Sequence, residues 1–351
     1  KIILLLLIPN KIFCSVILKE KKMFKPGQIL RWGILGCGDV TEVKSGPAYQ
    51  KTAGFELAAV MRRSAEKAQD YAHRHGVKKY YSNADALIED TSIDAIYIAT
   101  PPDTHKLYGL KVAAAGKPCC IEKPLAPSYA DSLAILEAFE QKQLPLFVAY
   151  YRRTLPRFLK IKEWLDAGKI GPVRHLEWQL CQPPSAADRA KIDQWRTDAR
   201  VAPGGYFDDL ASHGLNLFTY FFGAISTASG VSLNQQQLYT SKDAISGVWQ
   251  HENGITGMGN WNFGSATRAD HVKIYGSEGH LEFSVFDEHP IRFENATEFE
   301  QLSIPHPEHV HLPHVEQMRT QLFDPHFQHP SQGASALHTS WVMDKILGVL
   351  K

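Results

Sequence analysis

The stretch RWGILGCGDVTEVKSGPAYQ, residues 31–50, places three glycines within six positions, directly after an apolar run. We expect a strand over 29–36 and a short helix behind it, so that Gly36 and Gly38 form the turn between them. In a dinucleotide-binding unit the first glycine allows the tight bend, and the second allows close approach of the backbone to a pyrophosphate. Thr41 replaces the third glycine of the usual pattern. The stretch therefore predicts a dinucleotide site; the alternative is a glycine turn in an α/β domain that binds nothing.

Strand-like and helix-like segments alternate along the chain as far as residue 153. Further strands are expected over 55–61, 93–100, 118–124 and 144–153, and helices over 64–76, 104–116 and 127–143. The strands are apolar throughout and the helices are amphipathic, a pattern typical of a parallel sheet covered on both faces. The fold class is therefore α/β, with a doubly wound Rossmann sheet in a first domain over 23–150.

The pattern changes in the remaining residues, 151–351, which we expect to form a second domain. One amphipathic helix is expected over 157–171, and a final one over 335–350 that packs back on the body. Strand-like stretches occupy 173–181, 244–263, 271–286 and 290–295. Asn253 and Gly254 mark a hairpin turn inside the second of these stretches. These segments predict an α+β domain whose open, largely antiparallel sheet has helices on one face.

The composition is that of an ordinary globular protein. A chain of 351 residues suits two domains, and its net charge of +1 offers no basic excess for nucleic acid or anionic lipid. Five cysteines occur without a CxxC spacing, and the adjacent Cys119 and Cys120 lie in an apolar run. We interpret them as buried thiols of a reducing compartment and expect a cytoplasmic protein.

Residues 1–22 do not fit the rest of the chain. They contain two apolar runs separated by Pro9, Asn10 and Lys11. Each run is shorter than the roughly 20 residues that span a bilayer, and no A-x-A-like cleavage site follows them. We interpret the segment as a non-domain leader or an upstream-start segment in preference to a targeting sequence, and we expect no association with a membrane.

The residues after the second strand bear on the choice of cofactor. An acidic side chain at this position would accept hydrogen bonds from the ribose 2′-hydroxyl of NAD, whereas arginine would bind the 2′-phosphate of NADP. The chain reads VMRRSAEK here, with Arg62 and Arg63 in place of the acid. A guanidinium pairs with phosphate through two parallel hydrogen bonds. The sequence therefore favours NADP(H), with NAD(H) as the alternative.

Four motifs resemble the glucose–fructose oxidoreductase, inositol dehydrogenase and MocA family. They are GILGCGDV, IATPPDTH, GKPCCIEKPLA and GGYFDDLASHGLNL, which occur in that order within roughly residues 29–350. The resemblance implies that Lys123 of the EKP element lies near the nicotinamide and takes part in proton transfer. It places the family's aspartate and histidine at Asp209 and His213, and a residue close to the cofactor at His105. Pro203 departs from the family's run of three glycines, which leaves the conformation of that loop open.

The chemistry of these residue types agrees with that implication. Oxidation of an alcohol needs a base of near-neutral pKa for the hydroxyl proton and a donor that steadies the oxygen. Asp209 and His213 are four positions apart, so on a helix they share one face. We predict His213 as the principal acid and base, Lys123 as proton relay and donor to the oxygen, and Asp209 as the orienting group. The alternative for His213 is a buried structural histidine.

The remaining candidate residues are assigned by their positions in these motifs and at the domain junction. The predicted cofactor-binding residues are Gly36, Gly38, Asp39, Val40, Arg62, Arg63, Thr100, Pro101, His105, Glu122 and Lys123. The predicted substrate-binding residues are Tyr151, Arg153, Trp195, Arg196, Asp209 and His213, with Arg152 beside them. Arginines at a domain junction are also commonly structural.

Four histidines at 306, 309, 311 and 314 raise the question of a metal site. Prolines interrupt the segment, and no cysteine or acidic ligand has a suitable spacing there. We therefore expect no metal.

The function predicted from the sequence is NADP(H)-dependent oxidoreduction of a hydroxyl or carbonyl group on a sugar, cyclitol or related polyol. The resemblance implies a homodimer or homotetramer formed through the C-terminal sheet. Two alternatives remain open at this point: a non-catalytic regulator that binds nicotinamide cofactor, and a glycosidase that keeps its NAD tightly bound.

Overall fold

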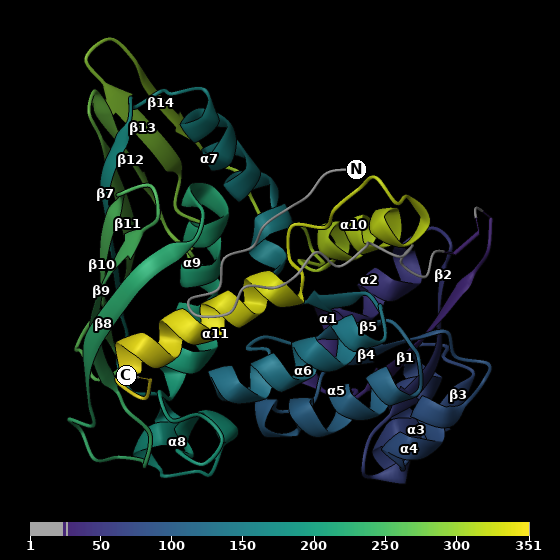
Figure 1. Cartoon of the computed structure of the whole chain (residues 1–351). Helices are drawn as coiled ribbons and strands as arrows, with labels where there is room; N and C mark the ends of the chain where they lie inside the picture. Colours follow the sequence, from purple (N-terminus) through teal and green to yellow (C-terminus); the bar gives the residue numbers. More distant parts are fainter. Residues whose placement is uncertain (1–23, 26, 351) are drawn as a thin grey trace.

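A computed structural model describes residues 24, 25 and 27–350, which form two sheets with helices between and around them (Figure 1). The predicted leader over 1–22 lies outside the described residues. The first half of the chain contains β1 (Leu30–Leu35), α1 (Asp39–Val43), α2 (Gly46–Lys51), β2 (Phe55–Met61), α3 (Ala65–Arg74), β3 (Lys79–Tyr81), α4 (Ala84–Glu89), β4 (Ala95–Ile98), the 3₁₀ turn η1 (Pro102–Thr104), α5 (His105–Ala114), β5 (Cys119–Ile121), α6 (Tyr129–Gln141), β6 (Leu146–Val148) and the 3₁₀ turn η2 (Tyr151–Thr154).

The second half of the chain contributes the other sheet and the helices that cover it. Its elements are α7 (Pro156–Asp166), β7 (Val173–Cys181), α8 (Ala186–Arg189), the 3₁₀ turn η3 (Trp195–Thr197), α9 (Tyr206–Phe222), β8 (Ile225–Leu233), β9 (Ala244–His251), β10 (Thr256–Asn262), β11 (Ala269–Gly276), β12 (Gly279–Phe283), β13 (Ile291–Asn295), β14 (Phe299–Leu302), α10 (Leu312–Phe323) and α11 (Gly333–Leu347).

The first sheet is parallel and has six strands in the order β3-β2-β1-β4-β5-β6. Two apolar cores fill its two faces: α2, α3 and α10 contribute to one of them, and α4, α5 and α6 to the other. Every residue of the central strand β4 is buried, as expected where helices cover both faces. The predicted doubly wound Rossmann sheet is confirmed.

The second sheet has eight strands in the order β14-β13-β12-β11-β7-β10-β9-β8. Neighbouring strands are antiparallel except for the pair β7 and β10, which is parallel. Strand β9 alternates buried and exposed residues, and helices α7, α9 and α11 supply the core on its inner face. The predicted open, largely antiparallel sheet is therefore confirmed, and Figure 1 shows it as a curved wall beside the helices.

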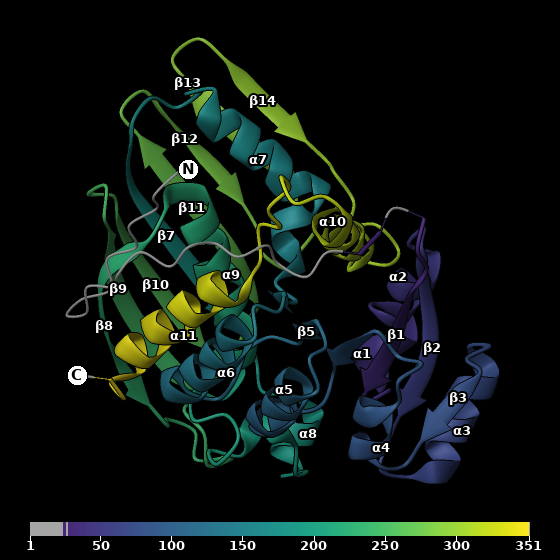
Figure 2. The ribbon, with the colours of Figure 1, turned by 45° about the vertical axis from the view of Figure 1, so that its right-hand side comes forward.

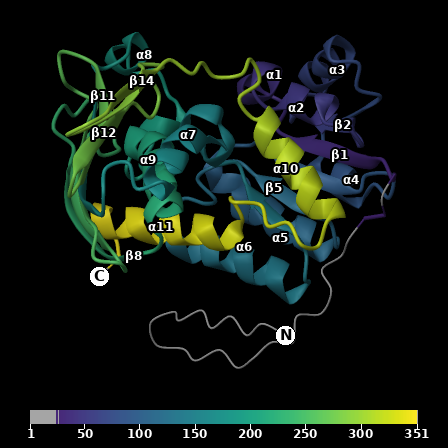
Figure 3. The same ribbon diagram turned by 90° about the horizontal axis from the view of Figure 1, so that it is seen from above.

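The chain returns to the first sheet after completing the second. Val315, Met318 and Leu322 of α10 lie in a core of the first sheet, and Figures 1 and 2 show α10 beside α2. Helix α11 then runs from α6 towards the edge strand β8 (Figure 3). The predicted packing of the last helix against the body is confirmed. The division into two domains at residue 150 stays a prediction. Helix α10 lies after that residue in the sequence but packs on the first sheet, which lies before it.

Several local elements differ from the sequence-based expectation. The helix expected to reach Tyr49 is broken into α1 and α2. Pro47 lies in the first turn of α2, where proline starts a helix and cannot continue one, and Ser45 Oγ donates to Val40 O at the junction. The strand expected over 144–153 ends at Val148, and the chain turns into η2. Strands β3, β8 and β14 and helices α4 and α10 were not expected. Most positions of β8 are exposed, so its sequence lacks the apolar signal of a buried strand.

Within the described residues, the structure contains no helix that is both long and apolar enough to cross a membrane.

Candidate active site

The glycine-rich turn joins the carboxyl ends of three neighbouring strands. Gly36 has a φ of +91°, and a Cβ at that position would lie 2.9 Å from the backbone nitrogen of Thr100. The amides of Gly36 and Cys37 donate to Met61 O at 2.9 and 3.1 Å. A Cβ placed at Gly38 would have a single neighbour within 4 Å among the described residues, Gly36 O at 3.9 Å, so the space beside this part of the backbone is open. The turn therefore needs glycine at 36, and it leaves a side-chain-free surface at 38.

Helix α1 begins directly after this turn. Asp39 is exposed and Val40 is half-buried. Thr41 is fully buried and its hydroxyl donates to Gly38 O at 2.7 Å, while Tyr71 donates to Thr41 O at 2.8 Å. The residue at the usual third glycine thus packs the helix onto its neighbours.

Arg62 and Arg63 follow β2 beside this turn. Arg62 is half-buried and Arg63 is exposed. Burial raises the pKa of the Cys37 thiol to about 11, and the nearby charge of Arg62 opposes that rise. Among the described residues, no carboxylate forms an ion pair with either arginine. Two cations therefore border the glycine turn without an acidic partner.

His105 connects two loops at the edge of the first sheet. Its ring is fully buried, with Nδ1 3.0 Å from Pro124 O and Nε2 2.8 Å from Thr100 O. Burial lowers the pKa of His105. Pro101 lies between these contacts and accepts a hydrogen bond from Thr104 N. The buried ring thus lies between the backbone oxygens of Thr100 and Pro124 and connects these two loops. Its place near a cofactor stays a prediction.

Glu122 lies at the end of β5 and is 7% exposed. Its carboxylate accepts hydrogen bonds from Tyr97 Oη and from the amide of Lys123. Burial raises the pKa of Glu122, and the charge of Lys123 opposes the rise. These bonds fix the backbone that presents Lys123.

Lys123 forms an ion pair that links the end of β5 to the start of α9. Its Nζ donates to Asp209 Oδ1 and, at 3.0 Å, to Asp209 O. Arg196 Nε donates to Asp209 Oδ2 at 2.6 Å. Burial would raise the pKa of Asp209, but the charges of Lys123 and Arg196 outweigh it and hold that pKa well below its usual range. Asp209 is therefore a carboxylate held between two cations.

His213 lies one helical turn after Asp209 and is 4% exposed. Its Nδ1 is buried and has no hydrogen-bond partner in the described part of the chain. Burial lowers the pKa of His213 well below its usual value, and the charges of Lys123 and Arg152 lower it further. The structure does not show the predicted contact between Asp209 and His213. The two carboxylate oxygens of Asp209 accept hydrogen bonds from Lys123 and Arg196 instead.

The loop before α9 sets the position of Asp209. Gly205 has a φ of +63°, and a Cβ there would lie 2.6 Å from Lys242 O. Lys242 N donates to Pro203 O at 3.0 Å, and Gly205 N donates to Ala202 O at 2.9 Å. The loop thus closes with Pro203 in place of the family's first glycine.

The two adjacent arginines of η2 have different surroundings. Arg153 donates to Asn216 Oδ1, Asn216 O, Pro330 O and Thr219 Oγ1, at distances of 2.6 to 2.8 Å. Its guanidinium is therefore committed to α9 and to the segment before α11, which does not fit the predicted substrate contact. Arg152 has no such bonds to the described residues and lies over the rings of Tyr151 and Phe286.

Tyr151 contacts two histidines from distant parts of the chain. The centre of its ring lies 5.4 Å from that of His213 and 4.4 Å from that of His311. His311 is 2% exposed, and its Nε2 is 3.8 Å from Glu122 Oε1. From the sequence His311 is a candidate only for a metal ligand, since no local pattern shows that the 306–314 segment reaches this point. No group of three His, Cys, Asp or Glu side chains in the described ranges is arranged to hold a metal.

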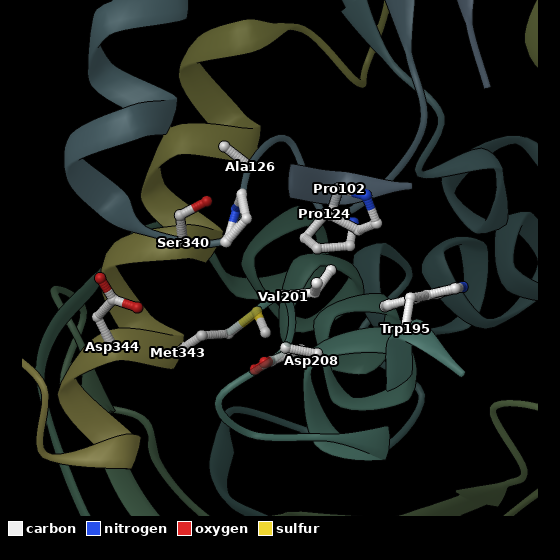
Figure 4. Close-up of a pocket in the computed structure, with 11 residues that line it drawn as sticks. Pro102, Pro124, Ala126, Trp195, Val201, Asp208, Ser340, Met343 and Asp344 are labelled. Atoms are coloured by element: carbon white, nitrogen blue, oxygen red, sulfur yellow. The ribbon is translucent and has the colours of Figure 1, made fainter. Parts of the chain in front are cut away.

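Trp195 stacks against the guanidinium of Arg196, 4.5 Å from the ring centre. It also lines a small pocket between the loops of Pro102 and Pro124 and the helix α11 (Figure 4). Asp208 lines the same pocket, whereas Lys123 and His213 do not. The pocket thus lies beside the Lys123–Asp209 pair and is separate from it.

The residues around the glycine turn fit a dinucleotide. Gly36 and Gly38 leave the backbone of the turn free of side chains, and Arg62 and Arg63 offer unpaired positive charge beside it. Both features favour the binding of phosphate groups.

Comparison with known proteins defines the class of this protein. Residues 30–150 match the model of an oxidoreductase family with an NAD-binding Rossmann fold, and residues 158–282 match the GFO/IDH/MocA C-terminal domain. The chain belongs to the Gfo/Idh/MocA family of oxidoreductases, and it is an enzyme of the dehydrogenase and reductase class.

Individual relatives agree with this assignment. Oxidoreductase P35 of Formosa agariphila is 37% identical over 320 residues, which cover 91% of this chain and 98% of the relative. The scyllo-inositol 2-dehydrogenase (NAD(+)) of Bacillus subtilis is 29% identical over 203 residues, 57% of this chain and 56% of the relative. The solved structure of levoglucosan dehydrogenase in complex with NADH and levoglucosan has a TM-score of 0.78 at 20% identity, covering 90% of this chain and 96% of that chain. This last likeness shows the shared fold.

Proposed function

We propose that the protein is an NADP(H)-dependent oxidoreductase that interconverts a hydroxyl and a carbonyl group on a sugar, cyclitol or related polyol. The observation that carries the proposal is the buried Lys123–Asp209 ion pair, with His213 one turn further along α9. Relatives named as acting on inositol and on levoglucosan support the substrate class. The bound nicotinamide would supply the hydride acceptor or donor.

Lys123 is the donor to the reacting oxygen. An ammonium group has three N–H bonds, and Asp209 accepts two of them through Oδ1 and its backbone oxygen. The third is free to donate to a substrate hydroxyl or carbonyl oxygen. Asp209 keeps Lys123 in position, and Arg196 holds Asp209 from its other oxygen.

His213 takes up and returns the hydroxyl proton. Its pKa is lowered by burial and by nearby cations, so the imidazole is neutral at pH 7 and able to accept a proton. In the oxidation direction the hydroxyl proton moves to a ring nitrogen of His213 as the carbon loses hydride. In the reduction direction the same proton returns to the oxygen.

Arg62 and Arg63 bind the 2′-phosphate that distinguishes NADP(H) from NAD(H). Support comes from their place after β2, beside the glycine turn and without acidic partners. A carboxylate in this position would instead favour the ribose hydroxyl of NAD.

Cofactor fluorescence tests the proposed function. The purified protein is titrated separately with NADPH and NADH, and a panel of sugars, polyols and their oxidised forms is then added to the complex. We expect tighter binding of NADPH and a substrate-dependent change in reduced cofactor. Binding without net hydride transfer to any panel member would instead favour a regulator or a glycosidase with bound cofactor.

The outer face of the second sheet is the proposed contact between copies of the chain. Several large apolar side chains are exposed on strands β8, β9 and β10 of this sheet: Val231, Leu233, Val248 and Met258. Light scattering during gel filtration would give the mass of a dimer or tetramer. A Val248→Glu variant should shift that mass towards the monomer, and a monomeric wild type would contradict the proposal.

A further inference from the structure

Arg152 is a buried cation without an acidic partner. The side chain is 6% exposed, and its Nε is buried with no hydrogen-bond partner. Within the described residues no carboxylate lies within ion-pair distance of it, and its terminal nitrogens have no protein acceptor. Removing a charge from water is costly, so buried charges are normally paired or bind a ligand. Two aromatic rings compensate in part, because the guanidinium carbon lies 4.5 Å from the ring centre of Phe286 and 5.1 Å from that of Tyr151.

The nearby arginines show that this arrangement is particular to Arg152. Arg153 is equally buried but makes four hydrogen bonds. Arg157 is 1% exposed and its Nε also lacks a partner in the described part of the chain, but its Nη2 donates to His289 O at 2.8 Å and to Ser284 Oγ at 3.4 Å. Asp287, which follows Phe286, pairs with Arg268 at 2.7 Å. Asp270 accepts hydrogen bonds from Trp178 Nε1 and from the amide of Phe286. Both carboxylates are therefore engaged by other donors.

Arg152 lies close to the proposed reaction centre and adds to a local excess of positive charge. Besides burial, the charge of Arg152 lowers the pKa of His213 and also those of His306 and His311. The exposed Lys44 acts in the same direction on His213 and His311, whereas Glu288 opposes the cations at His306. Lys123 is balanced by Asp209, which Arg196 shares. Two cations thus share one carboxylate, and Arg152 is the buried cation of this region that has neither a carboxylate nor another protein acceptor among the described residues.

We propose that Arg152 binds the carboxylate of the substrate, so that the enzyme acts on a sugar acid instead of a neutral sugar. This inference rests on the proposed function, since it names the substrate class of the same site. The planar guanidinium offers parallel N–H donors that match the two oxygens of a carboxylate. The cofactor phosphates are an unsuitable partner, because the glycine turn and Arg62 lie on the first sheet. Arg152 instead lies over Tyr151 and Phe286, whose rings both contact His213.

Calorimetric titration of the protein saturated with NADP+ tests this assignment without requiring turnover. The probes are D-glucuronate and D-glucose, which differ by a carboxylate in place of a CH2OH group, and D-glucose 6-sulfate as a second anion. We expect glucuronate to bind at least tenfold more tightly than glucose. Arg152→Gln should weaken glucuronate binding by about 10- to 100-fold, the range for a hydrogen bond to a charged group, and should leave glucose binding within about threefold.

Two further variants keep the test decisive. Arg152→Lys retains the charge without the planar fork, so it should recover part of the lost affinity for glucuronate. Arg200→Gln removes a cation whose side chain is 89% exposed and should change nothing. The assignment would be overturned if glucose and glucuronate bound equally well, or if glucuronate did not bind at millimolar concentration. It would also be overturned if D-glucose 6-sulfate bound more tightly than glucuronate, or if the preference for glucuronate survived Arg152→Gln. Hydride transfer is measured separately, so a neutral substrate that turns over would overturn this inference and leave the proposed function intact.

Discussion

The two halves of the molecule contribute to the candidate active site in different ways. In the first sheet, Gly36, Arg62 and Lys123 all follow the carboxyl ends of parallel strands, where loops of neighbouring strands meet at one edge. In the second half, Asp209 and His213 share one face of a helix that is itself packed on an antiparallel sheet. The first half offers a surface for a dinucleotide and the second offers buried acid–base groups. The Lys123–Asp209 ion pair joins them, which makes it the most informative place to perturb the enzyme.

Lys123→Met should have the largest effect. The substitution removes the proposed donor to the substrate oxygen and leaves Asp209 with Arg196 alone, so we expect turnover to fall by about 10³-fold or more. Cofactor binding, carried by the first half, should stay within about threefold. Steady-state kinetics and cofactor fluorescence measure the two effects.

Lys160→Met is the matched control, because that half-buried lysine pairs with Glu163 and lies over the ring of Trp164, both on α7. Near-normal turnover in Lys123→Met would show that the ion pair is structural.

His213→Ala should lower turnover by about 10²- to 10⁴-fold, the usual range for a general base. In the wild type, oxidation is lost as falling pH protonates the imidazole. Because burial and the charge of Lys123 lower the pKa of His213 well below its usual value, the acid limb of the rate profile should lie below pH 6.5. The limb should be absent from the variant, and an unchanged limb would assign it to another group.

Arg62→Asp combined with Arg63→Ala should reverse the cofactor preference by about 10- to 100-fold, since it exchanges a phosphate partner for a hydroxyl partner. The dissociation constants of NADPH and NADH report the change. Turnover at saturating cofactor should be nearly unaffected. Unaltered constants would place the 2′-phosphate elsewhere.

Gly205→Ala should give the smallest effect of the four and act on stability. A Cβ at this position would meet Lys242 O, and the positive φ is unfavourable for alanine, so we expect a loss of about 1–3 kcal/mol in the free energy of unfolding. Gly254→Ala is the control, since its φ of +88° is similar but its Cβ would meet nothing within 4 Å. Thermal unfolding compares the stabilities of the two variants. An equal loss of stability in both would show that the positive φ is the cause and that the contact with Lys242 O contributes nothing.

Much of the first half could be predicted from the sequence because its signals are local. Apolar strands, Ser64 as a helix cap and glycine at a positive φ each act over a few residues. Asp209 and His213 were found through a motif and their four-residue spacing. Their environment was not, because the Lys123–Asp209 pair spans 86 positions in the sequence.

Long-range contacts also explain which properties of the site residues could not be predicted from the sequence. Arg152 and Arg153 are adjacent and nearly equally buried, yet only Arg153 meets Asn216, Thr219 and Pro330. No local pattern distinguishes the two. Likewise, a base of near-neutral pKa was expected at His213, whereas burial beside Lys123 lowers its pKa. Both outcomes depend on tertiary packing.

A crystal structure of the protein with NADP+ is the most direct test of the account. We expect the pyrophosphate at Gly36 and Gly38, the 2′-phosphate between Arg62 and Arg63, and the nicotinamide beside Lys123 and His213. A cofactor bound with its nicotinamide away from the Lys123–Asp209 pair would contradict the central claim that the two halves meet at the reaction centre.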